Sequence, residues 1–227
     1  MRLLALDAST EACSAALLIG DELTCRYEEP AGGQGERILA MIEELLAEAG
    51  LRAAALDAIA AGVGPGAFTG VRIGVSVAQG LAFGADLRVV PIVTLEALAW
   101  RRIADGPVLA CLDARMGEVY WGCYRAHPAR GLVAQGQPRV GPVESVRPQG
   151  VPPLRGVGRA FTAYPSLRAA AAVAVDAPDA RALPDARDMA RLGAIRFAAG
   201  EALDPAGLAP VYLRDKVALT ESERAAR

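Results

Sequence analysis

Hydrophobic and polar positions at the start of the chain follow the pattern of short strands. An apolar run fills residues 2–6 and stops at Asp7, and two more strand-like stretches follow at 12–19 and 22–28, with a Gly-Asp turn between them. Strands joined by such short turns pair antiparallel. The chain is therefore predicted to open with an antiparallel meander.

The period then changes to that of an amphipathic helix. Between Gly35 and Ala49, apolar residues recur every three or four positions, and Gly50 follows as a stop signal. This mixture of strands and helices predicts an α/β fold. The elements expected next are a strand at 58–63, a helix from Thr69 to Phe83, a strand at 89–92 and a helix at 94–103 with Thr94 as its N-cap.

The second half begins by repeating the first. An apolar strand ends in Asp-Ala at Asp7 and again at Asp113, and two more strand candidates, 118–124 and 132–135, follow the second aspartate. A strand, acidic turn, strand, strand unit that occurs twice predicts two lobes of like topology. The predicted lobes are residues 1–100 and 101–227. The last predicted elements are a strand at 154–157, an alanine-rich stretch at 167–175, a helix at 185–199 and an extended segment at 210–213.

A glycine-rich segment, Gly64 to Gly74, lies between a buried strand and the start of a helix. Backbone amides in such a turn suit an anion, so one interpretation is contact with a phosphate or nucleotide. The other is a tight structural turn, because the spacing matches neither a dinucleotide fingerprint nor a phosphate loop. The residues that this segment offers to a phosphate or nucleotide are Gly64, Gly66, Thr69 and Arg72.

Small residues recur every four positions along the helix that follows, at Gly70, Gly74, Ala78 and Ala82. Such a ridge allows another helix to approach closely. A glycine inside a helix costs about 1 kcal/mol relative to alanine, so two of them indicate a neighbour that needs the space. That neighbour is either internal, with the helix at 35–49 as the obvious candidate, or another subunit.

Asp7, with Ser9 beside it, and Asp113 occupy equivalent strand ends in the two halves. In a two-lobed nucleotide-binding fold the two loops face each other across a cleft, where carboxylates hold a hydrated magnesium ion. The alternative is that each aspartate caps its own turn. The residues alone favour neither interpretation.

Composition and charge narrow the functional classes. The 227 residues are 53% hydrophobic and carry a net charge of −2, so the chain can bury a sizeable core but has no overall positive field for nucleic acid. No apolar run is long enough for a signal peptide or a membrane span, which predicts a cytoplasmic protein. Four cysteines without a Cys-x-x-Cys pair and a lone His127 predict reduced thiols and no metal site.

Catalytic motifs are absent from the sequence. Neither Ser-x-x-Lys, Gly-x-Ser-x-Gly nor His-Glu-x-x-His occurs, and a single histidine is poorly suited to activate a nucleophile. We therefore expect no catalytic residue, no metal and no resident cofactor in this chain.

Two segments carry a specific resemblance, Gly-Pro-Gly-Ala-Phe-Thr-Gly-Val-Arg-Ile-Gly at 64–74 and Asp-Ala-Arg-Met-Gly-Glu-Val-Tyr at 113–120. With shorter matches that run in order between residues 2 and 214, they resemble the TsaB family, formerly called YeaZ. The resemblance implies an actin-like, hsp70-like fold of two RNase H-like lobes. It also implies a non-catalytic scaffold subunit in the complex that transfers a threonylcarbamoyl group to the adenosine beside the anticodon of tRNA.

The same resemblance implies the partners. TsaB-like proteins dimerise with the paralogue TsaD, which holds the metal and performs the transfer, and the ATPase TsaE joins them. This implies a heterodimer with TsaD, a homodimer when TsaD is absent, indirect contact with tRNA, and at most weak nucleotide binding at the partner interface. The residues assigned to the interface are Arg37, Met41, Leu45, Gly70, Gly74, Ala78 and Ala82.

Two other functions compete with the scaffold. An active ATP-dependent phosphotransferase of the actin-like superfamily requires a catalytic carboxylate and an adenosine loop in the second lobe, for which Gly156-Val-Gly158 is the candidate. A metallopeptidase requires more than one histidine. TsaD-type proteins place two metal-binding histidines where this chain has Gln34 and its neighbours, so the ligands are missing.

Overall fold

The first sheet forms from the strands that the hydrophobic pattern predicts. In this computed structural model, which describes residues 1–30, 32–149 and 153–214, the sheet has the strand order β3-β2-β1-β4-β5. The first three strands are antiparallel, while β4 and β5 run parallel to β1. The strands are β1 (Arg2–Asp7), β2 (Cys13–Ile19), β3 (Glu22–Glu28), β4 (Ala58–Gly62) and β5 (Arg88–Ile92).

Burial explains the composition of these strands. The side chains of β1 and β4 are buried on both faces of the sheet, apart from Arg2, which accounts for their unbroken apolar runs. β3 lies at the edge, and its side chains are exposed or only partly buried. The predicted meander and the predicted buried strand at 58–63 are confirmed.

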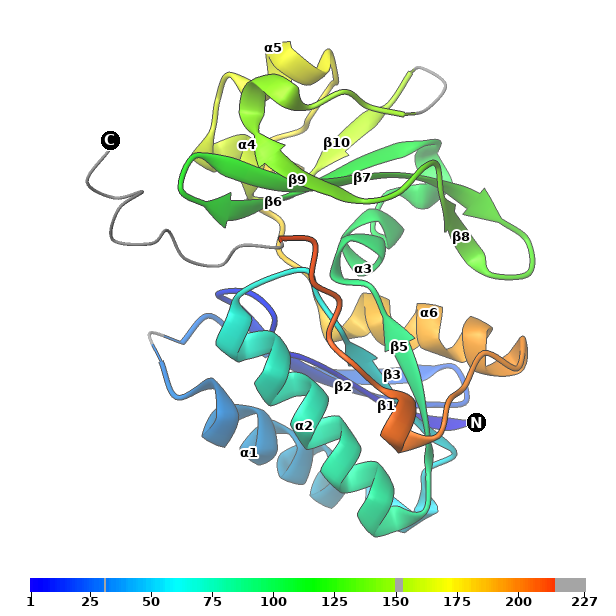
Figure 1. Cartoon of the computed structure of the whole chain (residues 1–227). Helices are drawn as coiled ribbons and strands as arrows, with labels where there is room; N and C mark the ends of the chain where they lie inside the picture. The colour runs from blue at the N-terminus through cyan, green and yellow to red at the C-terminus, as the bar shows by residue number, and fades with distance from the viewer. Residues whose placement is uncertain (31, 150–152, 215–227) are drawn as a thin grey trace.

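Helices cover the two faces of the first sheet (Figure 1). α1 (Gln34–Glu48) and α2 (Phe68–Ala85) cover one face, and α6 (Ala186–Ala198), much later in the chain, covers the other. α1 buries Ile38, Met41, Ile42 and Leu45, as the periodicity of its sequence predicts. The core of this part therefore has two layers, one on each side of the sheet.

The second sheet repeats the first in its central strands. β6 pairs antiparallel with β7 and parallel with β10, just as β1 pairs antiparallel with β2 and parallel with β4. β8 and β9 both pair with β7, at different ends of it. The repeat predicted from the two Asp-Ala strand ends is confirmed. The strands are β6 (Val108–Arg115), β7 (Glu118–His127), β8 (Gly131–Ala134), β9 (Arg139–Pro142) and β10 (Arg155–Val157).

A short helix joins the two sheets. α3 (Thr94–Trp100) lies between them, and its Leu98 belongs to one apolar cluster with Leu3 of the first sheet and Tyr124 of the second. Two other short helices, α4 (Ala160–Ala163) and α5 (Leu167–Ala171), cover the far face of the second sheet (Figure 1). None of the helices in the described part of the chain is long and apolar enough to cross a membrane.

The end of the described chain returns to the first sheet. Val89 exchanges backbone hydrogen bonds of 3.0 and 2.7 Å with Leu203, and the Val211 amide donates to the Val63 carbonyl at 2.7 Å. The segment then passes between the two sheets (Figure 1). The predicted domain boundary near residue 100 stays a prediction. Although they come late in the chain, α6 and this C-terminal segment pack with the first sheet.

Three local predictions differ from the structure. Thr94 is the first residue of α3 rather than its N-cap, and its hydroxyl donates to Ser9 at 3.2 Å while Glu96 accepts from the Val93 amide. α3 ends at Trp100 instead of continuing to residue 103. β7 extends to His127 instead of ending at the predicted residue 124, and β9 was not predicted because proline and glycine mark its sequence as a turn.

Candidate functional site

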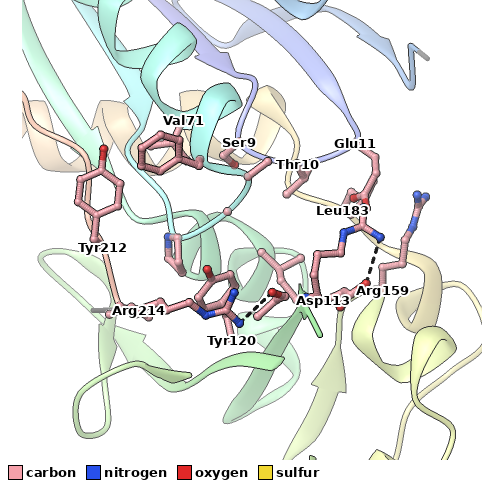
Figure 2. Close-up of a pocket in the computed structure, with 18 of the residues that line it drawn as sticks. Ser9, Thr10, Glu11, Val71, Asp113, Tyr120, Arg159, Leu183, Tyr212 and Arg214 are labelled. Carbon is pink, nitrogen blue, oxygen red and sulfur yellow. Dashed lines mark hydrogen bonds and ion pairs between the residues drawn. The ribbon is translucent and has the colours of Figure 1, made fainter. Parts of the chain in front are cut away.

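A cleft of about 550 Å³ lies between the two sheets (Figure 2). Its walls come from the loop after β1, the start of α2, the end of β6 and the C-terminal segment. Tyr212 and Arg214 lie on one side of it, and Glu11 and Arg159 on the other. Repeating lobes thus place equivalent strand ends around one concave site, which is where a two-lobed fold is expected to bind a ligand.

Ion pairs join the two sheets beside this cleft. Arg115 contacts Glu11 at 2.5 Å, and Arg159 contacts Glu29 at 2.8 Å. Arg214 pairs with Glu118 and also donates to the Ala114 carbonyl at 3.0 Å. Most of these side chains are about a third or more exposed, so each pair contributes no more than about 1 kcal/mol to stability. The arginines around the cleft are nevertheless already paired with carboxylates.

Asp113 holds a strained turn. Its Oδ1 accepts hydrogen bonds from the Arg115 amide at 2.7 Å and from the Tyr164 hydroxyl at 2.9 Å. Arg115 and Met116 have φ values of 64° and 58°, a left-handed conformation that non-glycine residues adopt at a cost. The turn-capping interpretation of Asp113 is therefore favoured by the structure, although the residue also lines the cleft.

Asp7 lies in a different environment from Asp113. Its side chain is fully buried, accepts a hydrogen bond from Ser9 at 3.0 Å through Oδ2, and has no hydrogen-bond partner at Oδ1. Burial raises the pKa of Asp7 to about 6 because it removes water from the charged form. Asp7 is not among the cleft-lining residues, whereas Ser9 and Asp113 are. The cleft does not present the two carboxylates together.

Replacing Asp7 with asparagine is expected to stabilise the protein above pH 6. The folded-state pKa of Asp7 is about 6 and its usual value is 3.8, so the folded protein holds this proton more tightly than the unfolded chain. Stability therefore falls as pH rises from about 4 to about 6, by on the order of 3 kcal/mol. Unfolding free energies from denaturant titrations between pH 4 and pH 8 would measure this change.

Asp188 supplies the control for that experiment. Burial also raises its pKa to about 6, so it titrates in the same range, with Arg101, Arg187 and Arg191 opposing the shift. Asp188→Asn should remove its own part of the pH dependence and leave that of Asp7. If Asp7→Asn keeps the whole wild-type pH profile, Asp7 is not the group responsible.

The glycine-rich turn packs closely against the loop after β1. A Cβ added to Gly66 would lie 2.0 Å from the Ser9 carbonyl oxygen, and the Ala67 amide already donates to that same oxygen at 2.7 Å. The Gly64 carbonyl accepts from the Thr94 amide at 2.8 Å. Close packing in the turn therefore explains why glycine is needed at these positions, so the tight-turn interpretation is favoured over phosphate contact.

The residues predicted for phosphate or nucleotide contact are divided among several places. Ser9, Gly66 and Asp113 line the cleft. Asp7 and Gly64 are buried and do not line it, while Thr69 and Arg72 lie on the outer surface of α2 and line a separate groove. The structure does not bring these seven residues together as one site.

The ridge of small residues on α2 faces the interior. A Cβ added to Gly70 would lie 2.0 Å from the Ala8 carbonyl oxygen, and Gly74 lies against the Ala8 amide and the Gly62 carbonyl. Ala78 and Ala82, the other two members of the ridge, are fully buried. The neighbour that needs the space is therefore internal, but it is mainly the loop after β1 and the end of β4 rather than the predicted helix at 35–49. A large side chain at Gly74 would press on the sheet before reaching a partner.

This burial changes the assignment of interface residues. Met41 and Leu45 of α1 are buried in the same layer as the ridge. Of the seven predicted interface residues, Arg37 alone is not buried, and it pairs with Glu28 and with Glu44. An interface on these two helices would have to use their outer surface, because the other six residues are enclosed within this chain.

The outer surface of α1 and α2 has an open, largely apolar groove of about 590 Å³. Leu39 and Phe68 are 44% and 42% exposed, and Ile73 and Val77 lie beside them, only partly buried. Exposed apolar patches of this kind on a helix pair mark interaction surfaces. Sequence reasoning missed the groove because it considered the small residues of α2, whereas Phe68, Ile73 and Val77 place apolar side chains on the outer side of the helix.

Phe68 connects the groove with the cleft, since it lines both. The guanidinium group of Arg72 lies 3.6 Å from the centre of the Phe68 ring and donates to the Tyr212 hydroxyl at 2.8 Å. These contacts attach the C-terminal segment to the N-terminal end of α2. Arg72, predicted for phosphate, binds two aromatic side chains in this structure.

Metal ligands are not grouped in the part of the chain that the structure describes, since no three His, Cys, Asp or Glu side chains are placed to hold an ion. The four cysteines are free thiols, with Cys13, Cys111 and Cys123 buried and Cys25 partly buried. Burial raises the pKa of each of these thiols. They behave as core residues rather than as reactive groups.

Comparisons with known proteins agree with the resemblance in the sequence. The family model of TsaD, described as tRNA N6-adenosine threonylcarbamoyltransferase, matches residues 33–137. The protein TsaB of Escherichia coli K12, named for tRNA threonylcarbamoyladenosine biosynthesis, is 36% identical over 96% of both chains, and the Haemophilus influenzae TsaB is 38% identical over 96% of this chain and 95% of its own. The solved structure of YeaZ from Pseudomonas aeruginosa has 40% identity, a TM-score of 0.82, and coverage of 93% of this chain and 99% of its own.

Proposed function

The chain belongs to the TsaB family of tRNA threonylcarbamoyladenosine biosynthesis proteins, and we propose that it serves this pathway as a non-catalytic scaffold that binds TsaD. In this role TsaD transfers the threonylcarbamoyl group to the adenosine beside the anticodon, and the present chain holds TsaD in an active arrangement. The actin-like fold of two RNase H-like lobes is shared with the TsaD-type family to which residues 33–137 are similar.

One observation carries this proposal, the exposed apolar groove on the outer surface of α1 and α2. Leu39 and Phe68 are too large and too exposed to serve the core of the chain, which is complete beneath them. A groove between two helices, with Leu39 from α1 and Phe68, Ile73 and Val77 from α2, suits helices from another protein. A paralogue with a matching helix pair supplies that contact, so we assign TsaD to this groove. In the absence of TsaD we expect the same groove to form a homodimer.

The chemistry of the cleft supports a non-catalytic role. The arginines beside it are paired with carboxylates, Asp113 is occupied by its turn, and Asp7 is buried away from the cleft. An enzyme requires groups that are free to act on a substrate. We therefore assign transfer to TsaD and assign no catalytic residue, metal or resident cofactor to this chain.

The remaining parts of the proposal follow from the family. We place the protein in the cytoplasm, with TsaE joining the heterodimer and tRNA engaged chiefly through TsaD. Any nucleotide is expected to bind weakly at the interface with the partner.

Reconstitution tests the proposed function. Purified TsaD and TsaE, with tRNA and the activated threonylcarbamoyl donor, should modify tRNA only when this chain is added, and this chain alone should modify none. The measured quantity is threonylcarbamoyladenosine in the recovered tRNA. Steady ATP turnover by this chain alone would support a phosphotransferase instead, and full modification without the chain would remove the scaffold role.

A further inference from the structure

Charge is divided very unevenly along this chain. Residues 101–182, which contain the whole second sheet, have eleven arginines and six acidic residues, a formal charge of +5. Residues 1–100 have six arginines and thirteen acidic residues, a formal charge of −7. The net charge of −2 therefore hides a basic half, and a local positive field attracts phosphates even where the whole protein is acidic.

Several arginines of the basic half are not neutralised. Among the described residues, five of the eleven form ion pairs, Arg102, Arg115, Arg130, Arg155 and Arg159. Arg125, Arg139 and Arg147 are exposed and have no carboxylate within ion-pairing distance in that part of the chain. Exposed guanidinium groups without a carboxylate can bind a phosphate. Arg147 can do so through its other nitrogens, because its Nη1 donates to the Glu144 and Val146 carbonyls at 2.7 and 2.9 Å.

Strand register places Arg125 and Arg139 on one face of the second sheet. Alternate residues of a strand share a face, so Arg125 lies on the same face as Trp121 and Cys123. Arg139 of β9 is directly opposite Trp121, and side chains of opposite residues in an antiparallel pair point the same way. The Gln149 amide donates to the Cys123 sulfur at 3.2 Å, which brings the segment of Arg147 to this face as well.

This face is distant from the groove assigned to TsaD. Trp121 and Cys123 belong to the apolar cluster beneath α4 and α5, on the side of the second sheet that faces away from the first sheet (Figure 1). The groove lies on α1 and α2, which cover the face of the first sheet that is turned away from the second sheet. A partner on the groove therefore leaves the arginine face open.

We propose that the face of the second sheet with Arg125, Arg139 and Arg147 binds the phosphate backbone of tRNA within the complex. The proposal rests on the proposed function, because it takes tRNA as the polyanion present. Guanidinium groups contact phosphate without reading sequence, so the face positions the tRNA rather than selecting it. The isolated chain still binds tRNA weakly, since its acidic half opposes the contact and three arginines supply few phosphate contacts.

A pair of matched double variants tests the proposal. Arg125→Gln with Arg139→Gln removes two charges from this face, while Arg52→Gln with Arg88→Gln removes two exposed charges from the first half, where neither arginine forms an ion pair in the described structure. We expect the first variant to weaken tRNA binding by the complex with TsaD about tenfold at low salt. It should also reduce the slope of log affinity against log salt by about one to two. The second variant should leave both unchanged.

Two measurements keep the outcomes distinct. Size-exclusion chromatography first shows whether each variant forms the complex with TsaD, and failure of the wild-type chain to do so would sink the proposed function and this inference with it. Fluorescence anisotropy with labelled tRNA then gives affinity and its salt dependence. Equal losses in both variants would mean a net-charge effect, and no loss in either would mean that tRNA does not touch this face; each result overturns the proposal.

Discussion

Alanine at Gly70 is expected to destabilise the protein by about 2–5 kcal/mol, although alanine normally stabilises a helix. The added methyl group would lie 2.0 Å from the carbonyl oxygen of Ala8, in the buried loop after β1. Either the first turn of α2 or that loop must move, and the loop also carries Ser9, which bonds Asp7 and Thr94. The free energy of unfolding in urea measures the loss.

Gly80 provides the matched control in the same helix. It is exposed, and a Cβ added there meets nothing within 4 Å, so Gly80→Ala should raise stability by roughly 0.5–1 kcal/mol. Opposite signs from one substitution type in one helix would show that contact, rather than helix propensity, decides at Gly70. A Gly70→Ala variant as stable as the wild type would contradict the close packing described for α2.

Glutamate at Leu39 is expected to weaken the complex with TsaD at least about a hundredfold while leaving the fold intact. Leu39 is 44% exposed at the groove on α1 and α2, so the substitution removes little from the core of the free chain. In the complex, a charge at the centre of an apolar contact loses its water without gaining a partner, which costs several kcal/mol. Isothermal titration calorimetry with TsaD measures the affinity.

Ile19→Glu is the control for that variant. Ile19 ends β2, is 36% exposed and lies outside the groove, so the same kind of change should leave the affinity for TsaD at its wild-type value. Circular dichroism melting of both variants verifies that each is folded. Wild-type affinity in Leu39→Glu would show that TsaD binds elsewhere, and the groove would then need another partner.

Much of the fold follows from local patterns in the sequence. The run before Asp7 and the run before Asp113 are each apolar because they become central, buried strands, and their shared ending reveals the repeat. β9 was not predicted, because it is a four-residue strand at the sheet edge and contains a proline and a glycine. The position of α6 could not be predicted either. Periodicity shows that a helix has an apolar face, but it does not show which sheet that face packs against.

The candidate site shows where sequence patterns stop. Asp7 and Asp113 look equivalent in sequence, yet one is buried without a partner for Oδ1 and the other accepts three hydrogen bonds at a turn. The spacing of Gly70 and Gly74 correctly indicates a close neighbour, but it does not distinguish a sheet from another subunit. Those differences arise from long-range packing, which a local pattern does not encode.

The return of α6 to the first sheet determines when this protein can finish folding on the ribosome. Leu3 and Ala5 belong to the layer that Met189 covers, so half of the first sheet stays unprotected until the chain beyond residue 185 has been made. At about 5–20 residues per second, synthesis of the intervening second sheet takes several seconds. During that interval we expect the nascent chain to present an apolar sheet face, a surface of the kind that chaperones bind.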